Sequence, residues 1–141
     1  MADQSVNLRA GLHNVGSYQV SGIPFVTCAL TAPATSSAPL EITFPSVTQR
    51  IQIHNNFSSD KPIRVGFSAN GVKGSNYWLV EAHQANGKSN DRIDLRVKTT
   101  KIYLLSDDNT AVTSSIYVLA ELTGITGYDL ATAYSGATGI G

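Results

Sequence analysis

Residues Asp91–Lys98 read DRIDLRVK, and this stretch decides the fold class of the chain. Three apolar side chains in it alternate with charged ones, namely Ile93, Leu95 and Val97. Successive side chains of a β-strand point to opposite faces, so this spacing predicts a strand with one buried and one hydrated face. The same alternation recurs along the chain, and the sequence therefore predicts an all-β protein.

Seven further segments resemble strands, and none of the 141 residues falls in a convincing helical stripe. The eight predicted strands are Pro24–Thr31, Leu40–Phe44, Val47–His54, Pro62–Ala69, Asn76–Ala82, Asp91–Lys98, Lys101–Ser106 and Thr113–Thr123. The first, seventh and eighth are apolar on both faces for part of their length. This is typical of strands covered on both sides, by a second sheet or by a neighbouring subunit.

The lengths of the connections favour one architecture, an all-β, eight-stranded antiparallel jelly-roll sandwich with a single jelly roll. Two connections are very tight, at Pro45-Ser46 and at Thr99-Thr100. In a jelly roll, the four longer connections emerge at one end of the wedge. Here the longer ones are rich in turn-forming residues and comprise Ala32–Pro39, Asn55–Lys61, His83–Asn90 and Asp107–Val112.

The chain length of 141 residues predicts one domain with flanking segments. We expect an N-terminal extension over residues 1–22, the jelly-roll domain over residues 23–123 and a tail rich in Gly, Ala and Tyr over residues 124–141. Such a tail is either disordered or lies along a neighbour and orders on assembly. In the second case its anchors would be Tyr128, Tyr134 and Ile140.

Composition argues against several classes of function. Lys plus Arg equals Asp plus Glu at ten each, and the first 22 residues carry only Asp3 and Arg9 as charges. Direct binding to nucleic acid is therefore not expected. No apolar run resembles a signal peptide or a membrane span, so we expect synthesis in the cytoplasm and no membrane insertion. The single cysteine, Cys28, is predicted to be a small buried hydrophobe; the alternative is a reactive thiol.

The sequence indicates no catalytic residue, metal site or cofactor, so we expect that the chain is not an enzyme. His13, His54 and His83 are far apart and lack the spacing of metal ligands. Asp107-Asp108-Asn109 could offer oxygen ligands to calcium, but it lacks the spaced acidic residues of a dedicated loop. A turn in which Asp and Asn bond their own backbone is the favoured interpretation.

Tyr77 and Trp78 are neighbours on a predicted strand and should point to opposite faces. Packing that covers both side chains is the favoured interpretation. An exposed aromatic side chain could instead stack on a sugar or insert into a partner. Trp78 is then the candidate exposed aromatic.

Five segments together resemble a known family. They are GIPFVT at Gly22–Thr27, FPSVTQR at Phe44–Arg50, IRVGFSANGV at Ile63–Val72, NYW at Asn76–Trp78 and VLAELT at Val118–Thr123. The chain over residues 22–125 is similar to the small single-jelly-roll penton proteins of large icosahedral double-stranded DNA viruses, of the chlorovirus kind.

The resemblance implies a structural virion protein, made in the host cytoplasm, that forms a homopentamer at each icosahedral vertex. Its neighbours would be major capsid proteins, with minor capsid proteins as further partners. The family supplies no catalytic residues. The candidate residues in the loops that face the fivefold axis are Asn55, Asn56, Asp60, Lys61, Asn86, Lys88, Asp107 and Asp108.

Two other functions compete with this one. The first is a carbohydrate- or receptor-binding β-sandwich module that uses Trp78 or Tyr77 as a stacking platform. The second is an enzyme of the cupin type, which requires clustered metal-binding histidines that the sequence does not suggest.

Overall fold

A computed structural model describes residues 22–83 and 90–126 of the chain. In these ranges it contains eight strands and one short helix, so the predicted all-β class is confirmed. The elements are β1 (Ile23–Ala32), β2 (Leu40–Thr43), β3 (Thr48–Asn55), β4 (Ile63–Gly66), α2 (Ala69–Lys73), β5 (Trp78–Val80), β6 (Arg92–Leu95), β7 (Lys101–Ser106) and β8 (Val112–Leu122).

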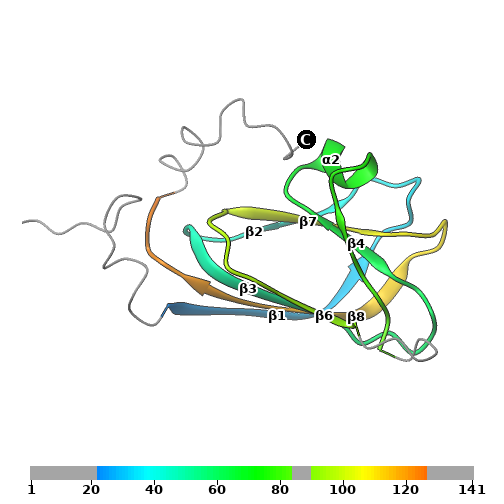
Figure 1. Cartoon of the computed structure of the whole chain (residues 1–141), viewed down its shortest axis with the longest axis horizontal. Helices are drawn as coiled ribbons and strands as arrows, with labels where there is room; N and C mark the ends of the chain where they lie inside the picture. The colour runs from blue at the N-terminus through cyan, green and yellow to red at the C-terminus, as the bar shows by residue number, and fades with distance from the viewer. Residues whose placement is uncertain (1–21, 84–89, 127–141) are drawn as a thin grey trace, which may run out of the picture.

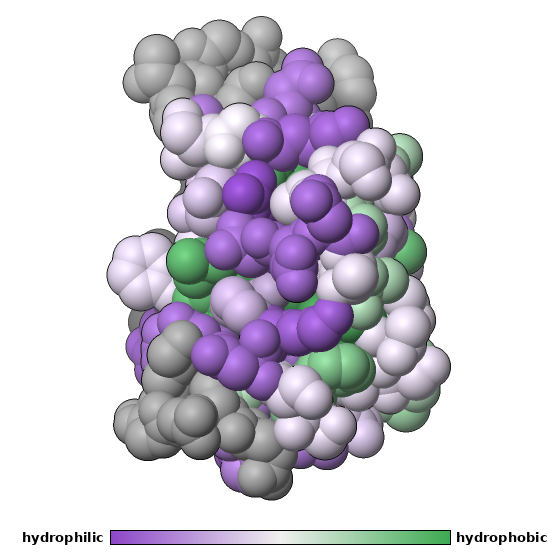
Figure 2. All heavy atoms as spheres, turned by 90° about the vertical axis from the view of Figure 1, so that its right-hand side faces the viewer, coloured by the Kyte–Doolittle hydropathy of each residue, from purple (hydrophilic) through white to green (hydrophobic). Residues whose placement is uncertain are grey.

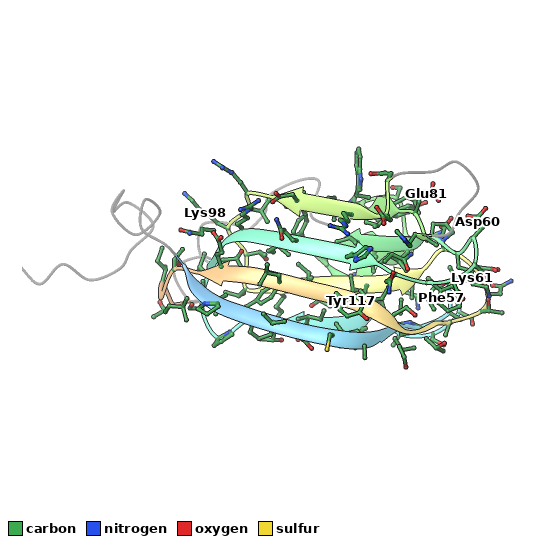
Figure 3. The ribbon with its side chains drawn as sticks, turned by 90° about the horizontal axis from the view of Figure 1, so that it is seen from below. Phe57, Asp60, Lys61, Glu81, Lys98 and Tyr117 are labelled. Carbon is green, nitrogen blue, oxygen red and sulfur yellow. The ribbon has the colours of Figure 1, made fainter. Side chains whose placement is uncertain are left out.

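The strands form two four-stranded antiparallel sheets that lie face to face as a sandwich (Figure 1). Sheet A has the order β1-β8-β3-β6, and Figure 3 views this sheet from its outer face. Sheet B has the order β2-β7-β4-β5. Consecutive strands alternate between the two sheets, except that β4 and β5 are neighbours within sheet B. Of the last two strands, β7 has an inner position in sheet B and β8 has an inner position in sheet A.

The core lies between the sheets and follows the alternation of the sequence. On β3 the side chains of Ile51 and Ile53 are fully buried, whereas the side chains between and beside them are partly exposed. Ile63 of β4 and Ile102 and Leu104 of β7 face them from sheet B and are equally buried. Burial of one such side chain contributes about 1.5–3 kcal/mol, so these alternating positions drive the pairing of the two layers.

The one helix of the described residues replaces the end of a predicted strand. The predicted strand extends to Ala69, but β4 ends at Gly66 and Ala69 is the first residue of α2. Ser68 explains the change, because its hydroxyl accepts a 2.9 Å hydrogen bond from the amide of Gly71 and caps the helix. The helix buries Val72 against β4, where a Cβ on Gly66 would lie 3.0 Å from the Cβ of Val72.

The stretch that suggested the fold, Asp91–Lys98, forms a shorter strand than predicted. β6 ends at Leu95, and beyond it the Thr48 side chain adds to a 2.9 Å backbone bond from the amide of Thr48 to the carbonyl of Thr99. The Thr48 hydroxyl donates to the carbonyl of Val97 at 2.7 Å and accepts from the amide of Thr99 at 3.2 Å. Thr48 is fully buried, so these two bonds satisfy a hydroxyl that is shielded from water.

The packed domain continues past residue 123, the boundary predicted from composition. Ile125 is fully buried, and its carbonyl accepts a 2.9 Å hydrogen bond from the amide of Val47. The amide of Thr123 donates in turn to the carbonyl of Val47. The proposed tail anchors Tyr128, Tyr134 and Ile140 lie outside the described residues.

The prediction that Cys28 is buried is wrong, because the residue is exposed. Cys28 lies two positions from Val26 and shares its outward direction on β1. An irregularity follows directly: the register with β8 shifts between Thr27 and Leu30, and Ala29 has a φ of 55°. An apolar stretch therefore does not predict burial for side chains on the outer face of an edge strand, because that face does not contact the core.

Candidate functional site

Four connections meet at one end of the sandwich, which we call the loop end. It comprises residues 33–39, 56–62, 107–111 and the described parts of the β5–β6 connection, 81–83 and 90–91. The amide of Thr35 donates to the carbonyl of Asp108 at 3.0 Å, which joins the β1–β2 and β7–β8 connections. The amide of Asp107 donates to the carbonyl of Pro62 at 3.1 Å, which adds the β3–β4 connection.

Polar side chains cover much of the loop end. Figure 2 looks onto this end of the molecule and shows a hydrophilic surface across its middle. Asp60 and Lys61 lie here beside Phe57 and Glu81, whereas Lys98 lies at the opposite end (Figure 3). The structure brings together five of the eight residues proposed to face the axis, namely Asn56, Asp60, Lys61, Asp107 and Asp108. Asn86 and Lys88 lie outside the described residues.

Asn55, the remaining candidate, corrects our interpretation of this connection. It is the last residue of β3 and is 0% exposed, so its side chain is not a surface group of the loop. Its amide nitrogen donates to the carbonyls of Lys61 and Val80 at 3.0 and 3.4 Å, and its side-chain oxygen accepts from the amide of Phe57. Asn55 therefore fixes the loop from inside.

The acidic turn Asp107-Asp108 has internal partners, which fits the turn interpretation. The Asp107 carboxylate lies 2.6 Å from the guanidinium of Arg64, which also stacks 4.3 Å above the ring of Tyr77. Asp108 accepts a hydrogen bond from the amide of Asn109, a bond local to the turn. Both carboxylates thus have partners within the chain.

An apolar strip lies on the outer face of sheet A, where a soluble sheet normally presents polar groups. Val26 of β1 is 69% exposed, and Tyr117 and Leu119 of β8 are each 42% exposed. We call these three residues the outer strip. Val26 and Leu119 are direct partners in the β1–β8 register, so their side chains touch on one face. Figure 3 labels Tyr117 on this face.

A second apolar surface lies at the opposite edge of the sandwich, between the edge strands β5 and β6. A depression of about 600 Å³ opens there, and we call it the open edge. Its apolar lining is Val65, Phe67, Trp78, Ile93 and Leu95, with Asn76, Asn90, Arg92 and Asp94 among its polar groups. Within residues 22–83 and 90–126, no strand closes the gap between β5 and β6.

Trp78 is 60% exposed in this open edge, so our prediction that packing covers both aromatic side chains is wrong. Trp78 pairs with Val65 in the β4–β5 register and therefore lies on the inward face of sheet B. It is exposed because β5 is an edge strand, with no further strand of the described residues beyond it. Tyr77 points the other way and is partly covered by Arg64.

The structure also brings together two histidines that the sequence separates. His54 Nε2 lies 3.2 Å and His83 Nδ1 lies 2.6 Å from the same oxygen of Asp91. The hydrogen bond from His83 lowers the pKa of the Asp91 carboxyl below its usual value. This trio is the one group in the described ranges whose side chains could together hold a metal ion. Sequence spacing gave no sign of it, because the three residues come from three separate segments.

Comparison with known proteins adds no assignment. No protein-family model matches the chain, and neither a curated protein nor a solved structure matches it. Within residues 22–83 and 90–126, no helix is long and apolar enough to cross a membrane.

An ion pair beside the outer strip gives a pH-dependent contribution to stability. Arg50 donates two hydrogen bonds to Asp94, at 2.9 and 2.5 Å, and these hold the pKa of Asp94 at about 2. The folded-state pKa is depressed, so this stability is present above the unfolded pKa and is lost as the pH falls from about 4 to about 2. Both side chains are more than a third exposed, so solvent screening keeps the effect small.

We expect Asp94→Asn to be slightly less stable than the parent protein at neutral pH and equally stable near pH 2. Urea unfolding at both pH values measures the difference. Arg50→Gln serves as the matched control, since it removes the same pair from the other side. If the stability of Asp94→Asn falls between neutral pH and pH 2 by as much as that of the parent protein, this assignment is contradicted.

Proposed function

We propose that this chain is a jelly-roll vertex protein, a structural subunit that assembles as a homopentamer at the fivefold vertices of an icosahedral capsid. The strand orders β1-β8-β3-β6 and β2-β7-β4-β5 carry the proposal. With the strands lettered B to I these orders read B-I-D-G and C-H-E-F, which supports a jelly roll built from two Greek keys. The gathering of four connections at the loop end supports the same topology.

The two exposed apolar surfaces support a ring. A heterologous contact joins two different patches on successive copies, and it closes when the rotation between copies closes. The outer strip lies on β1 and β8, whereas the open edge lies at β5 and β6, the far edges of sheets B and A. We propose that the outer strip of one copy packs against the open edge of the next. Trp78 would supply the large aromatic anchor typical of such contacts.

The remaining surfaces take roles that follow from this arrangement. The polar loop end, with Asp60 and Lys61, would face the fivefold axis, where identical loops from five copies meet. The other end would face the major capsid proteins and any minor capsid proteins around the vertex. The balanced charge, ten basic against ten acidic residues, gives no reason for direct contact with nucleic acid.

Light scattering on the purified full chain tests the assembly, and imaging of virus particles with a specific antibody tests the location. We expect a mass five times that of the chain, and label at the vertices. A chain that stays monomeric at high concentration and is absent from particles would exclude the proposal. If the chain forms a pentamer but is absent from particles, the proposed ring is supported and the proposed capsid role is contradicted.

A carbohydrate-binding module is the second candidate, and the exposure of Trp78 specifically favours it. An exposed indole beside the polar groups of Asn90 and Asp94 offers both a stacking surface and hydrogen-bonding partners for a sugar. On this proposal the open edge would be a ligand site instead of a subunit contact.

A glycan array followed by calorimetry separates these two candidates. If the open edge binds a sugar, Trp78→Ala should weaken binding by about tenfold, corresponding to about 1.4 kcal/mol. Trp78→Phe, which keeps an aromatic face, should retain part of the affinity. Binding that survives Trp78→Ala unchanged would place the sugar elsewhere, and the absence of any glycan signal would remove this candidate.

A further inference from the structure

Two imidazoles and one carboxylate converge at the loop end from three separate segments. His54 belongs to the end of β3, His83 follows β5, and Asp91 precedes β6. Their potential ligand atoms, one nitrogen from each ring and one carboxylate oxygen, all lie within 4.8 Å of one another. The Asp91 side chain is mostly buried, and that of His54 is about three-quarters buried.

We propose that His54, His83 and Asp91 form a binding site for a divalent transition metal ion, with zinc as the ion it fits best. Imidazole nitrogen and carboxylate oxygen are both zinc ligands. Two imidazoles disfavour magnesium and calcium, which prefer oxygen ligands throughout. Three protein ligands leave one tetrahedral position for water or for an external group. This site is independent of the vertex function, because one chain supplies all three ligands.

The spacing of the ligand atoms suits a small tetrahedral ion after a short adjustment. Metal–ligand bonds of about 2.0–2.2 Å place ligand atoms about 3.3–3.6 Å apart around a tetrahedral zinc ion. His54 Nε2 already lies 3.2 Å from Asp91 Oδ2. His83 Nδ1 lies closer, at 2.6 Å, which is a hydrogen-bonding distance. The His83 side chain is 47% exposed, so it can withdraw by the remaining fraction of an ångström.

The backbone holds the three segments together whether or not a metal ion binds. The amide of Asn55 donates to the carbonyl of Asp91 at 2.9 Å, and the amide of His83 donates to the carbonyl of Asn55 at 3.0 Å. Asn55 is fully buried and directly follows His54 in the chain. One buried residue therefore sets the position of all three ligand-bearing segments, as a preorganised site requires.

Neighbouring rings restrict the orientation of His54. The ring of Tyr117 stacks against it at 6.0 Å between centroids, and the ring of His83 meets it edge-on at 5.9 Å. Tyr117 and His54 are direct partners in the β3–β8 register, so this contact is built into sheet A. A histidine whose ring is held in this way loses little conformational freedom when it binds a metal ion.

Calorimetric titration of the full chain with Zn²⁺, and separately with Mg²⁺, tests the proposal. We expect one Zn²⁺ per chain, an increase in melting temperature on binding and no comparable signal with Mg²⁺. His83→Gln and Asp91→Asn should each weaken Zn²⁺ binding at least about tenfold. His13→Gln is the matched control, because it removes the third histidine of the chain and should leave the affinity within about twofold.

The ligands can also be identified without reference to stability. Co²⁺ bound in place of zinc should give visible absorption that His83→Gln and Asp91→Asn abolish and His13→Gln retains. Circular dichroism establishes that each variant is folded. A folded parent protein without stoichiometric Zn²⁺ binding would show that the trio is a hydrogen-bonded cluster only. Binding that disappears with His13→Gln, or survives His83→Gln and Asp91→Asn unchanged, would equally overturn the site.

Discussion

Leu119→Arg is expected to convert the proposed pentamer into single folded chains. Leu119 lies in the middle of the outer strip, paired with Val26 on one side and with Gln52 on the other. In the proposed ring, each of the five contacts would bury a guanidinium against an apolar surface without a partner. Loss of about 2 kcal/mol or more at each contact is typical of a central interface residue, and five contacts would fail together.

Light scattering over a range of concentrations measures this change, and the single chain should keep its fold. The Leu119 side chain is 42% exposed in the isolated domain, so its replacement should change the free energy of unfolding by about 0.5 kcal/mol or less. Thr43→Arg is the control, since it adds the same charge at an exposed position on the outer face of sheet B. If both variants remain pentameric, the outer strip is not the contact surface.

Asn55→Ala is expected to lower the free energy of unfolding by about 2–4 kcal/mol. The substitution removes the amide that bonds the carbonyls of Lys61 and Val80, and the oxygen that accepts from the amide of Phe57. These backbone groups lie in a region shielded from water, and each unsatisfied buried group costs about 1–3 kcal/mol. Urea unfolding of the single chain measures the loss.

Asn56→Ala is the matched control, because the neighbouring asparagine is exposed and its replacement should cost about 0.5 kcal/mol or less. The two variants also separate stability from metal binding. Asn55→Ala retains the backbone amide and carbonyl that bond Asp91 and His83, so the folded variant should still bind Zn²⁺. Equal stability of the two variants would show that the side-chain bonds of Asn55 contribute little.

Alternation of apolar and polar residues was sufficient to predict the strands. Each of the eight observed strands overlaps a predicted one, and β7, Lys101–Ser106, has the predicted limits. The errors lie at the ends of elements, where side-chain hydrogen bonds help to set the course of the chain. The Ser68 hydroxyl caps a helix after β4, and the Thr48 hydroxyl bonds the backbone after β6. A short stretch of sequence does not predict such hydrogen-bond partners, because residues such as Thr48 and Thr99 are far apart in the chain.

Surface features were harder to predict, since they depend on which strands lie at the edges. Trp78 lies on the inward face of sheet B, yet it is exposed because β5 is the edge strand of that sheet. Cys28 lies in an apolar stretch, yet it is exposed because it faces out from β1, an edge strand of sheet A. The trio His54, His83 and Asp91 forms only when β3 pairs with β6. Strand order is a property of the whole chain, and short sequence windows do not specify it.

The order of the strands also constrains when this protein can fold during its synthesis. β8 lies between β1 and β3, and β7 lies between β2 and β4, so the last two strands of the described residues join strands made earlier. Sheet B cannot be completed before β7 is made, nor sheet A before β8, and until then several earlier strands lack a partner. Such nascent chains are prone to aggregation, so we expect the domain to fold only after β8 has left the ribosome and to depend on chaperones that protect the unfinished polypeptide.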